Sequence, residues 1–231
     1  MKTCVLLTQY KRNHLEKQLQ QIKKQTLQPD YLIVFQNEEH INIDHLKQKY
    51  DFIHVKSDFN TKFFGRFSYC FNIPADIFLI LDDDIIPGIR CIETYSKQCI
   101  KKNGIIGGNG RYSLINIKTS KRRHPHDNIR PGTQVDFVGH LWCFKKEWLH
   151  FMFRDSPYTY DTGEDMQLCF SSKLYGGIQS YVGEHKTKED FADITLSKYS
   201  SDQFSSYKTT SNDLRKMVEK YWQDKGLIFI T

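Results

Sequence analysis

The sequence predicts an α/β protein with a mainly parallel central sheet that helices cover on both faces. Over roughly the first hundred residues, short apolar runs typical of buried strands alternate with segments whose apolar residues recur at helical spacing. This alternation is typical of a parallel sheet with helices packed on both sides. A chain of 231 residues with 39% hydrophobic residues is long enough for a sizeable core, and we expect a single domain.

The first half of the chain contains the clearest elements. Leu15, Leu19 and Ile22 recur at helical spacing in a Lys- and Gln-rich segment that ends before Pro29. Gly104 is expected to end the last helix of this half. Strands are predicted at 3–8, 31–35, 52–55 and 77–81, and helices at 15–22, around 43–46 and at 89–99.

The second half is less regular, and no break in it is strong enough to divide the chain into two domains. Its apolar segment 135–144 is predicted to be extended, and the Ser-, Thr- and Lys-rich segment 186–210 is predicted to be a mobile loop. The other expected elements are a turn-rich start of a strand at 104–110, a basic loop at 116–133, helices at 145–153, 164–174 and 214–222, and a strand at 178–182.

Composition argues against several classes of protein. The net charge of +6 comes from Lys and Arg spread along the chain rather than gathered in a dense basic face, so we expect no nucleic-acid partner. Six cysteines without a C-x-x-C pair indicate free thiols in a reducing compartment. No window is long and apolar enough for a transmembrane segment, and the N-terminal apolar stretch is too short for a signal peptide. We therefore expect a soluble, cytoplasmic protein.

Asp82, Asp83 and Asp84 directly follow the strand predicted at 77–81. In an extended chain Asp82 and Asp84 point to one side, and two like charges this close need a cation or hydrogen-bond donors nearby. Mg²⁺ and Mn²⁺ prefer such oxygen ligands and keep part of their shell for water and substrate phosphate. The motif therefore predicts a divalent metal that binds a diphosphate at the carboxyl edge of the sheet. The alternative is a solvated acidic turn, which the Pro-Gly pair just beyond would favour.

A second acidic motif, Asp161-Thr-Gly-Glu164-Asp165, precedes an apolar stripe at helical spacing. Glu164 and Asp165 are therefore expected in the first turn of a helix, where the helix dipole and free N–H groups favour ionised carboxylates. Such a carboxylate can act as a general base or as a nucleophile. The alternative is a purely structural helix cap.

In combination, the two motifs resemble those of the GT-A-fold glycosyltransferases, the nucleotide-sugar-dependent enzymes that include the family 2 type. The matching features come in the expected order. An N-terminal strand is followed by an apolar strand with Asp82-Asp83-Asp84, and then by Gly-Glu164-Asp165 at the start of a helix.

This resemblance covers roughly residues 3–185, and the segment 135–148 resembles the part that these enzymes place beside the acceptor. It implies one Rossmann-like GT-A catalytic domain with a nucleotide-binding half at 1–110. The acceptor-side half would be 111–231, including the mobile loop at 186–210 and the C-terminal helix.

The resemblance also implies a divalent metal, Mn²⁺ or Mg²⁺, and its ligands. Asp84 would bind the metal directly. Asp82 would bind the metal or contact the ribose, and Asp83 would contact the ribose or metal-bound water. His185, which follows the strand at 178–182, would complete the metal shell, since neutral imidazole is a suitable Mn²⁺ ligand.

The nucleotide would contact further residues. Arg66 matches a basic residue that precedes the aspartates and faces the nucleotide, and a guanidinium can bind phosphate through two parallel hydrogen bonds. The remaining positions end the first two strands: they are Thr8, Tyr10 and Arg12 for the base and phosphates, and Gln36, Asn37 or Glu38 beside the uracil.

The expected reaction is metal-dependent transfer of a sugar from a nucleoside diphosphate sugar, a UDP-sugar in our expectation, to a hydroxyl of a glycan or other acceptor. Asp165 would act as the base and give inversion, with Glu164 supporting or replacing it, and a retaining outcome stays open. Two alternatives remain. One is a metal-dependent phosphodiesterase or nucleotidyltransferase, and the other is a non-catalytic sugar- or nucleotide-binding module on the same fold.

Overall fold

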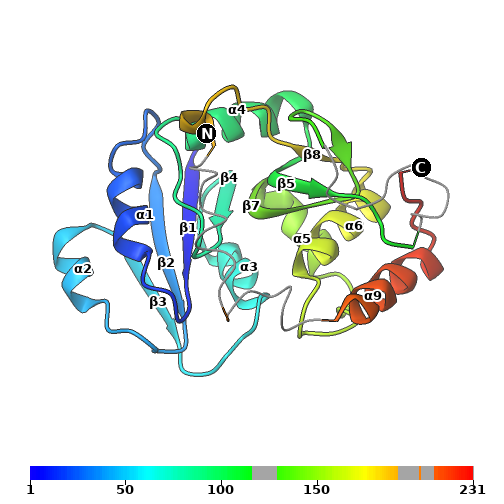
Figure 1. Cartoon of the computed structure of the whole chain (residues 1–231), viewed down its shortest axis with the longest axis horizontal. Helices are drawn as coiled ribbons and strands as arrows, with labels where there is room; N and C mark the ends of the chain where they lie inside the picture. The colour runs from blue at the N-terminus through cyan, green and yellow to red at the C-terminus, as the bar shows by residue number, and fades with distance from the viewer. Residues whose placement is uncertain (116–128, 192–202, 204–210, 231) are drawn as a thin grey trace.

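The computed structural model describes residues 1–115, 129–191, 203 and 211–230. Its centre is one mixed sheet of eight strands (Figure 1). In spatial order the strands are β3 (Ile53–Ser57), β2 (Tyr31–Asn37), β1 (Thr3–Gln9), β4 (Ile77–Leu81), β7 (Phe137–Lys145), β5 (Ile105–Arg111), β8 (Ser180–Val182) and β6 (Gln134–Val135).

The N-terminal part of the sheet is parallel. β1 pairs in parallel with β2 and β4, and β2 pairs in parallel with β3. β1, β2 and β4 carry apolar runs because helices and neighbouring strands bury both faces, and all five residues of β4 are buried. The carboxyl ends of β1, β2 and β4 therefore meet at one edge of the sheet.

β7 joins this parallel part to the rest of the sheet. It runs antiparallel to both β4 and β5, with Leu141 opposite Leu81, so its first residues lie just beyond the carboxyl end of β4. β8 then pairs in parallel with β5, and β6 pairs antiparallel with β8. The predicted α/β class with a mainly parallel sheet is confirmed, and the antiparallel pairs are those made by β7 and β6.

Most helices lie between strands in the sequence, and η3 and α9 follow the last strand, β8. α6 begins after Gly163, whose φ of +86° favours glycine, and it ends at Gly177 with a φ of +67°. The helical elements are α1 (Leu15–Ile22), α2 (Asp44–Lys49), α3 (Gly65–Tyr69), η1 (Cys70–Asn72), α4 (Cys91–Lys102), η2 (Lys146–Trp148), α5 (Leu149–Met152), α6 (Glu164–Gly176), η3 (Lys188–Asp190) and α9 (Asn212–Asp224).

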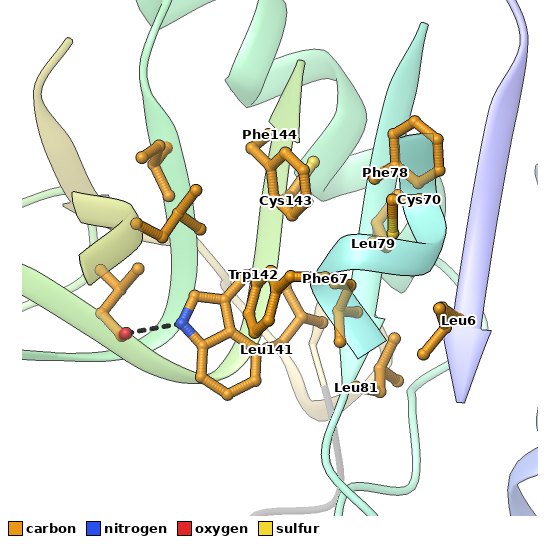
Figure 2. Packing of buried hydrophobic residues seen from close by; sticks show 14 of the residues in the cluster. Leu6, Phe67, Cys70, Phe78, Leu79, Leu81, Leu141, Trp142, Cys143 and Phe144 are labelled. Atoms are coloured by element: carbon orange, nitrogen blue, oxygen red, sulfur yellow. Dashed lines mark hydrogen bonds between the residues drawn. The ribbon is translucent and has the colours of Figure 1, made fainter. Parts of the chain in front are cut away.

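The core beneath the carboxyl edge is rich in aromatic rings. Figure 2 shows Phe67 of α3 beside Trp142 of β7, and their ring centroids are 5.6 Å apart. Phe144 stacks on Phe67 at 6.1 Å. The indole N–H of Trp142 donates to the carbonyl of Val138 at 2.8 Å (Figure 2). This packing fixes α3 against β7, and buried aromatic pairs of this kind add stability beyond their area.

Most of the predicted elements are present. The C-terminal helix expected at 214–222 is α9, and the extended segment expected at 135–144 forms β6 and β7. Large parts of the two predicted loops lie outside the described residues. These parts are 116–128 of the loop at 116–133, and 192–202 and 204–210 of the loop at 186–210. All six cysteines are free and buried. In the part of the chain that the structure describes, no helix is long and apolar enough to cross a membrane.

Candidate active site

A cleft of about 920 Å³ opens at the carboxyl edge of β1, β2 and β4. The first turn of α6, the end of β5 and part of β7 also border it. The two acidic motifs, far apart in the sequence, therefore face the same space. Of the predicted site residues, those that line the cleft are Thr8, Tyr10, Arg12, Asn37, Arg66, Asp82, Asp83, Asp84, Glu164 and Asp165.

The three aspartates begin where β4 ends. The backbone N–H of Asp82 donates to the carbonyl of His140 at 3.1 Å, which fixes the turn against β7. Arg12 Nη1 lies 2.5 Å from Asp83 Oδ1 and 3.3 Å from Asp84 Oδ2. Burial raises the pKa of Asp83 to about 6 against the influence of Arg12. Burial and the charge of Asp82 raise the pKa of Asp84 to about 7. The guanidinium of Arg12 thus contacts the carboxylates of both Asp83 and Asp84. An additional positive charge near these carboxylates would be favourable.

Arg66 connects the two acidic motifs, and only 3% of it is exposed. Its Nη1 lies 2.5 Å from Asp82 Oδ1, and its Nη2 lies 3.1 Å from Glu164 Oε1. Nη1 also donates to Thr8 Oγ1 at 3.1 Å. The guanidinium lies over the ring of Trp142, 4.6 Å from its centroid. Arg66 therefore holds β1, β4 and α6 together, while its contact with a nucleotide phosphate stays a prediction.

Glu164 and Asp165 are the first two residues of α6, as the motif predicts. The backbone N–H of Met166 donates to Asp165 Oδ1 at 2.8 Å. Burial raises the pKa of Asp165, and the charge of Arg111 opposes that shift most strongly. Burial and the charge of Asp165 raise the pKa of Glu164 to about 8, which Arg66 opposes. Burial thus raises the pKa of both acids, and because the two carboxyls are adjacent they titrate as a pair.

The ends of β1 and β2 form a polar wall on one side of the cleft. Asn60 Nδ2 donates to Tyr10 Oη at 3.0 Å, and Asn37 Nδ2 donates to Asn60 Oδ1 at 3.0 Å. Asn37 Oδ1 accepts from the backbone N–H of Thr61 at 2.8 Å. This network holds Tyr10 and Asn37 in place beside Arg12.

Gln36 does not face the cleft. It is fully buried, its Nε2 donates to the carbonyl of Ile41 at 2.7 Å, and its Oε1 is 2.9 Å from His54 Nε2. Side chains alternate along a strand, so Gln36 and Asn37 point to opposite faces of β2. Glu38 does not line the cleft either. Of the three residues expected beside a uracil, Asn37 lines the cleft and Gln36 and Glu38 do not, and the contact with a uracil stays a prediction.

His185 does not line the cleft. Its Nδ1 is 3.1 Å from the carbonyl of Gly183, and its ring centroid is 5.4 Å from that of Phe191. It lines a separate hollow of about 650 Å³. β7 and β5 separate β8, which precedes His185, from β4, which precedes the aspartates. The structure therefore gives no support to the expected role of His185 in the metal shell.

Solved structures of similar shape include glycosyltransferases. TarS from S. aureus superposes with a TM-score of 0.59 at 12% identity, over 81% of this chain and 36% of that chain. TarS residues 1–349 in complex with UDP superpose with a TM-score of 0.58 at 11% identity, over 83% of this chain and 60% of that chain. The mannosyltransferase PcManGT from Pyrobaculum calidifontis, in complex with GDP-Man and Mn²⁺, superposes with a TM-score of 0.54 at 15% identity. The match covers 79% of this chain and 55% of that chain. The chain has a GT-A glycosyltransferase fold.

The likeness has clear bounds. The chain spans 36% to 60% of the length of these solved GT-A proteins. No protein-family profile matches the chain, and no curated protein matches it. At 11% to 15% identity the comparison establishes the GT-A fold, and function has to be argued from the site itself.

The GT-A cleft also contains residues to which no motif of the sequence assigns a role. Arg111 ends β5, Arg215 lies on α9, and His140 lies near the start of β7. Arg111 and Arg215 belong to no motif, and only the folded chain brings them to one cleft. His140 falls in the segment 135–148 that resembles an acceptor-side region, but its φ of +67° has no signature in the sequence.

The aspartate cluster fits a divalent metal that is shared with a bound diphosphate. Its carboxylate oxygens are hard ligands, and burial raises the pKa of Asp83 and Asp84, which a bound cation would lower. Among the described residues, no group of three His, Cys, Asp or Glu side chains is arranged to hold a metal alone. Mg²⁺ sites commonly use one or two carboxylates and complete their shell with substrate phosphates and water.

Proposed function

We propose that the chain is a metal-dependent glycosyltransferase that transfers a sugar from a nucleoside diphosphate sugar to a hydroxyl of a glycan or other acceptor. One observation carries the proposal: Arg66 joins the strand-end aspartates to the acidic start of α6 within a single cleft. The GT-A fold supports it, because solved proteins of this fold bind UDP, or GDP-Man with Mn²⁺. A UDP-sugar is the donor that we test first.

In this proposal the half of the chain at 1–110 binds the donor. Asp82 and Asp84 would hold Mn²⁺ or Mg²⁺, and Asp83 would lie beside the ribose. A bound divalent metal supplies charge neutralisation for the departing diphosphate. Arg12 already lies beside Asp83 and Asp84, so it is placed to bind a phosphate oxygen. The base and ribose would contact Thr8, Tyr10 and Asn37.

Asp165 would act as the general base. It would take the proton of the acceptor hydroxyl while that oxygen attacks the anomeric carbon and the bond to the diphosphate breaks, which inverts the configuration. Burial raises the pKa of Asp165 and makes it a stronger base than an ordinary aspartate. Arg66 holds the neighbouring Glu164 at 3.1 Å, which fixes the first turn of α6. Glu164 would thus support the base rather than replace it.

The half at 111–231 would bind the acceptor. Its contribution to the cleft comes from β7, from the first turn of α6 and from α9. The cellular compartment in this proposal is the cytoplasm, because all six cysteines are free and buried, as is usual under reducing conditions.

A thermal-shift screen of nucleotides and nucleotide sugars, each with and without Mn²⁺, tests the proposal. We expect UDP or a UDP-sugar to raise the melting temperature in the presence of Mn²⁺, because a ligand that binds the folded state stabilises it. EDTA should remove most of that increase. If no nucleotide shifts the melting temperature with or without metal, the proposal is wrong.

Two single variants separate donor binding from chemistry. Asp84→Asn should lose the Mn²⁺-dependent part of the UDP shift, since it removes a proposed metal ligand. Asp165→Asn should keep the UDP shift and lower the rate of UDP release from the donor about a hundred- to ten-thousandfold, the usual contribution of a general base. Asp213→Asn, an exposed acid that pairs with Lys216 on α9, is the matched control.

The alternative of a phosphodiesterase or nucleotidyltransferase is less well supported. Such enzymes gather several acids around one or two metal ions. In the described part of the chain no three acids or histidines form such a group, and Arg66 occupies the space between the two acidic motifs.

A further inference from the structure

Two arginines line the cleft on the side away from the proposed donor site. Arg111 ends β5, and Arg215 lies in the first turns of α9. The strand order places β5 beyond β7 as seen from β1 and β4 (Figure 1). Arg111 is also the cation that most strongly opposes the burial-induced rise in the pKa of Asp165, so the arginine pair borders the proposed base.

These arginines differ from the others that the cleft contains. Arg12 and Arg66 each contact two carboxylates. Arg111 and Arg215, by contrast, form no ion pair with any carboxylate of the described residues. The Nε of Arg111 is buried and has no hydrogen-bond partner there. A guanidinium nitrogen that is buried without a partner is unfavourable, and a bound anion would offset that cost.

We propose that Arg111 and Arg215 form an anion-binding subsite that recognises a carboxylate or phosphate group on the acceptor saccharide. This inference rests on the proposed transferase function, because it assigns the arginine side of the cleft to the acceptor. A guanidinium pair suits planar carboxylates and phosphates through parallel hydrogen bonds. An acceptor held in this way would have its hydroxyls close to Asp165.

The donor is the other source of an anionic group, either through its diphosphate or through an acidic sugar. The geometry favours the acceptor, because Arg12 and the aspartates lie at the ends of β1 and β4, whereas the arginine pair lies beyond β7. The test must therefore measure donor binding and saccharide binding separately.

Ligand-observed NMR can measure the binding of glucose 6-phosphate, glucuronate and neutral glucose to the whole protein with UDP and Mn²⁺ present. The variants are Arg111→Gln and Arg215→Gln, with Arg111→Lys as a charge-preserving variant that also checks folding. Lys216→Gln is the matched control, because Lys216 is adjacent on α9, exposed, and pairs with Asp213.

We expect the wild type to bind the two anionic sugars about tenfold more tightly than glucose, which corresponds to one or two charge-assisted hydrogen bonds. Arg111→Gln and Arg215→Gln should each abolish this preference and leave the affinity for UDP unchanged. Arg111→Lys should retain part of the preference, and Lys216→Gln all of it.

Several outcomes would overturn the subsite. The wild type could bind charged sugars no better than glucose, or both glutamine variants could keep the preference. A fall in UDP affinity in the two glutamine variants would assign the arginines to the donor instead. Binding of charged sugars by a protein that binds no nucleotide would support an anion site and refute the transferase, so the two proposals fail in distinguishable ways.

Discussion

The molecule contains two sets of buried acids, and their comparison shows what distinguishes a candidate active site from a structural network. One set is the cleft group of Asp82, Asp83, Asp84, Glu164 and Asp165. The other set, Asp136 and Glu219, lies in the interior between the end of β5, the C-terminal segment and α9. Burial raises the pKa of Asp83, Asp84, Glu164 and Asp165 in the cleft and of both interior acids.

The interior acids have different partners from those of the cleft. Asp136 accepts hydrogen bonds from the backbone N–H groups of Ser113 at 2.9 Å and Ile230 at 2.8 Å. Glu219 accepts from Ser113 Oγ at 2.8 Å and from the backbone N–H of Ile115 at 3.0 Å. These bonds tie three distant segments together, and neither acid lines the cleft. A raised pKa alone therefore does not mark a functional site, and what sets the first group apart is that its acids line an open cleft.

Among the substitutions that test this comparison, Arg66→Met is expected to lower the free energy of unfolding the most. The substitution leaves the buried Glu164 and the partly exposed Asp82 without their cation, and breaking a buried pair costs about 3–5 kcal/mol of unfolding free energy. Urea unfolding at pH 7 measures the loss, and the UDP-dependent thermal shift should disappear with it. A loss below about 1 kcal/mol would show that the cleft acids do not depend on Arg66.

Arg90→Met is the matched control for this prediction. Arg90 also contacts two carboxylates, with Nη1 2.5 Å from Glu189 and Nε 2.8 Å from Asp190, but it lies at the surface. Exposed ion pairs contribute at most about 1 kcal/mol, so this variant should be nearly as stable as the wild type.

A smaller effect is expected from Ser113→Ala in the interior set. The substitution removes the hydroxyl that donates to Glu219 and leaves the backbone donors in place. The expected loss is about 1–2 kcal/mol of unfolding free energy, again by urea unfolding. Because Ser113 does not line the cleft, the UDP-dependent shift should be unchanged. A variant that loses the UDP shift at full stability would contradict the separation of the two sets.

The smallest effect concerns the pH dependence of stability in Glu219→Gln. Burial raises the pKa of Glu219 in the folded protein, so folding favours its protonated form. Its contribution to stability is complete below the pKa of the unfolded chain and is lost as the pH rises through the folded pKa. Glutamine keeps an acceptor oxygen and does not titrate. The variant should therefore gain stability relative to wild type as the pH rises from about 4 to 8.

Glu93→Gln provides a control of opposite sign. A hydrogen bond from Lys97 lowers the pKa of Glu93, so its contribution is present at neutral pH and is lost as the pH falls through the folded pKa. Unfolding curves at a series of pH values should thus give slopes of opposite sign for the two variants relative to wild type. Equal slopes would show that Glu219 titrates as an exposed acid.

Local sequence signals were enough to predict the parallel part of the fold and both acidic motifs. The apolar run before Asp82 and the apolar stripe after Asp165 each have a clear period, and both elements are present at those positions. By contrast, α3 was not predicted, because five residues that begin with Gly65 are too few to show a helical period. Its position depends on the packing of Phe67 against Trp142, which is a long-range contact.

The site residues that the sequence misplaced or missed depend on strand order and strand face. Gln36 and Asn37 are adjacent, and the pleat of β2 sends only Asn37 to the cleft. His185 does not line the cleft, because it follows β8, which pairs with β5, and its expected place at the metal stays a prediction. Arg111 and Arg215 meet only because the last helix returns to the end of β5. No local pattern encodes such pairings, since they are decided by the whole fold.

His140 carries one further consequence. Its left-handed backbone, with φ at +67°, is unfavourable by about 1–2 kcal/mol for a residue with a side chain, and it lies where β7 meets the aspartate turn. Glycine at this position would relieve the strain and would also take the imidazole out of the cleft. A protein selected only for heat resistance would therefore be expected to carry glycine here, and the histidine shows that the backbone tolerates this strain in exchange for an imidazole that lines the cleft.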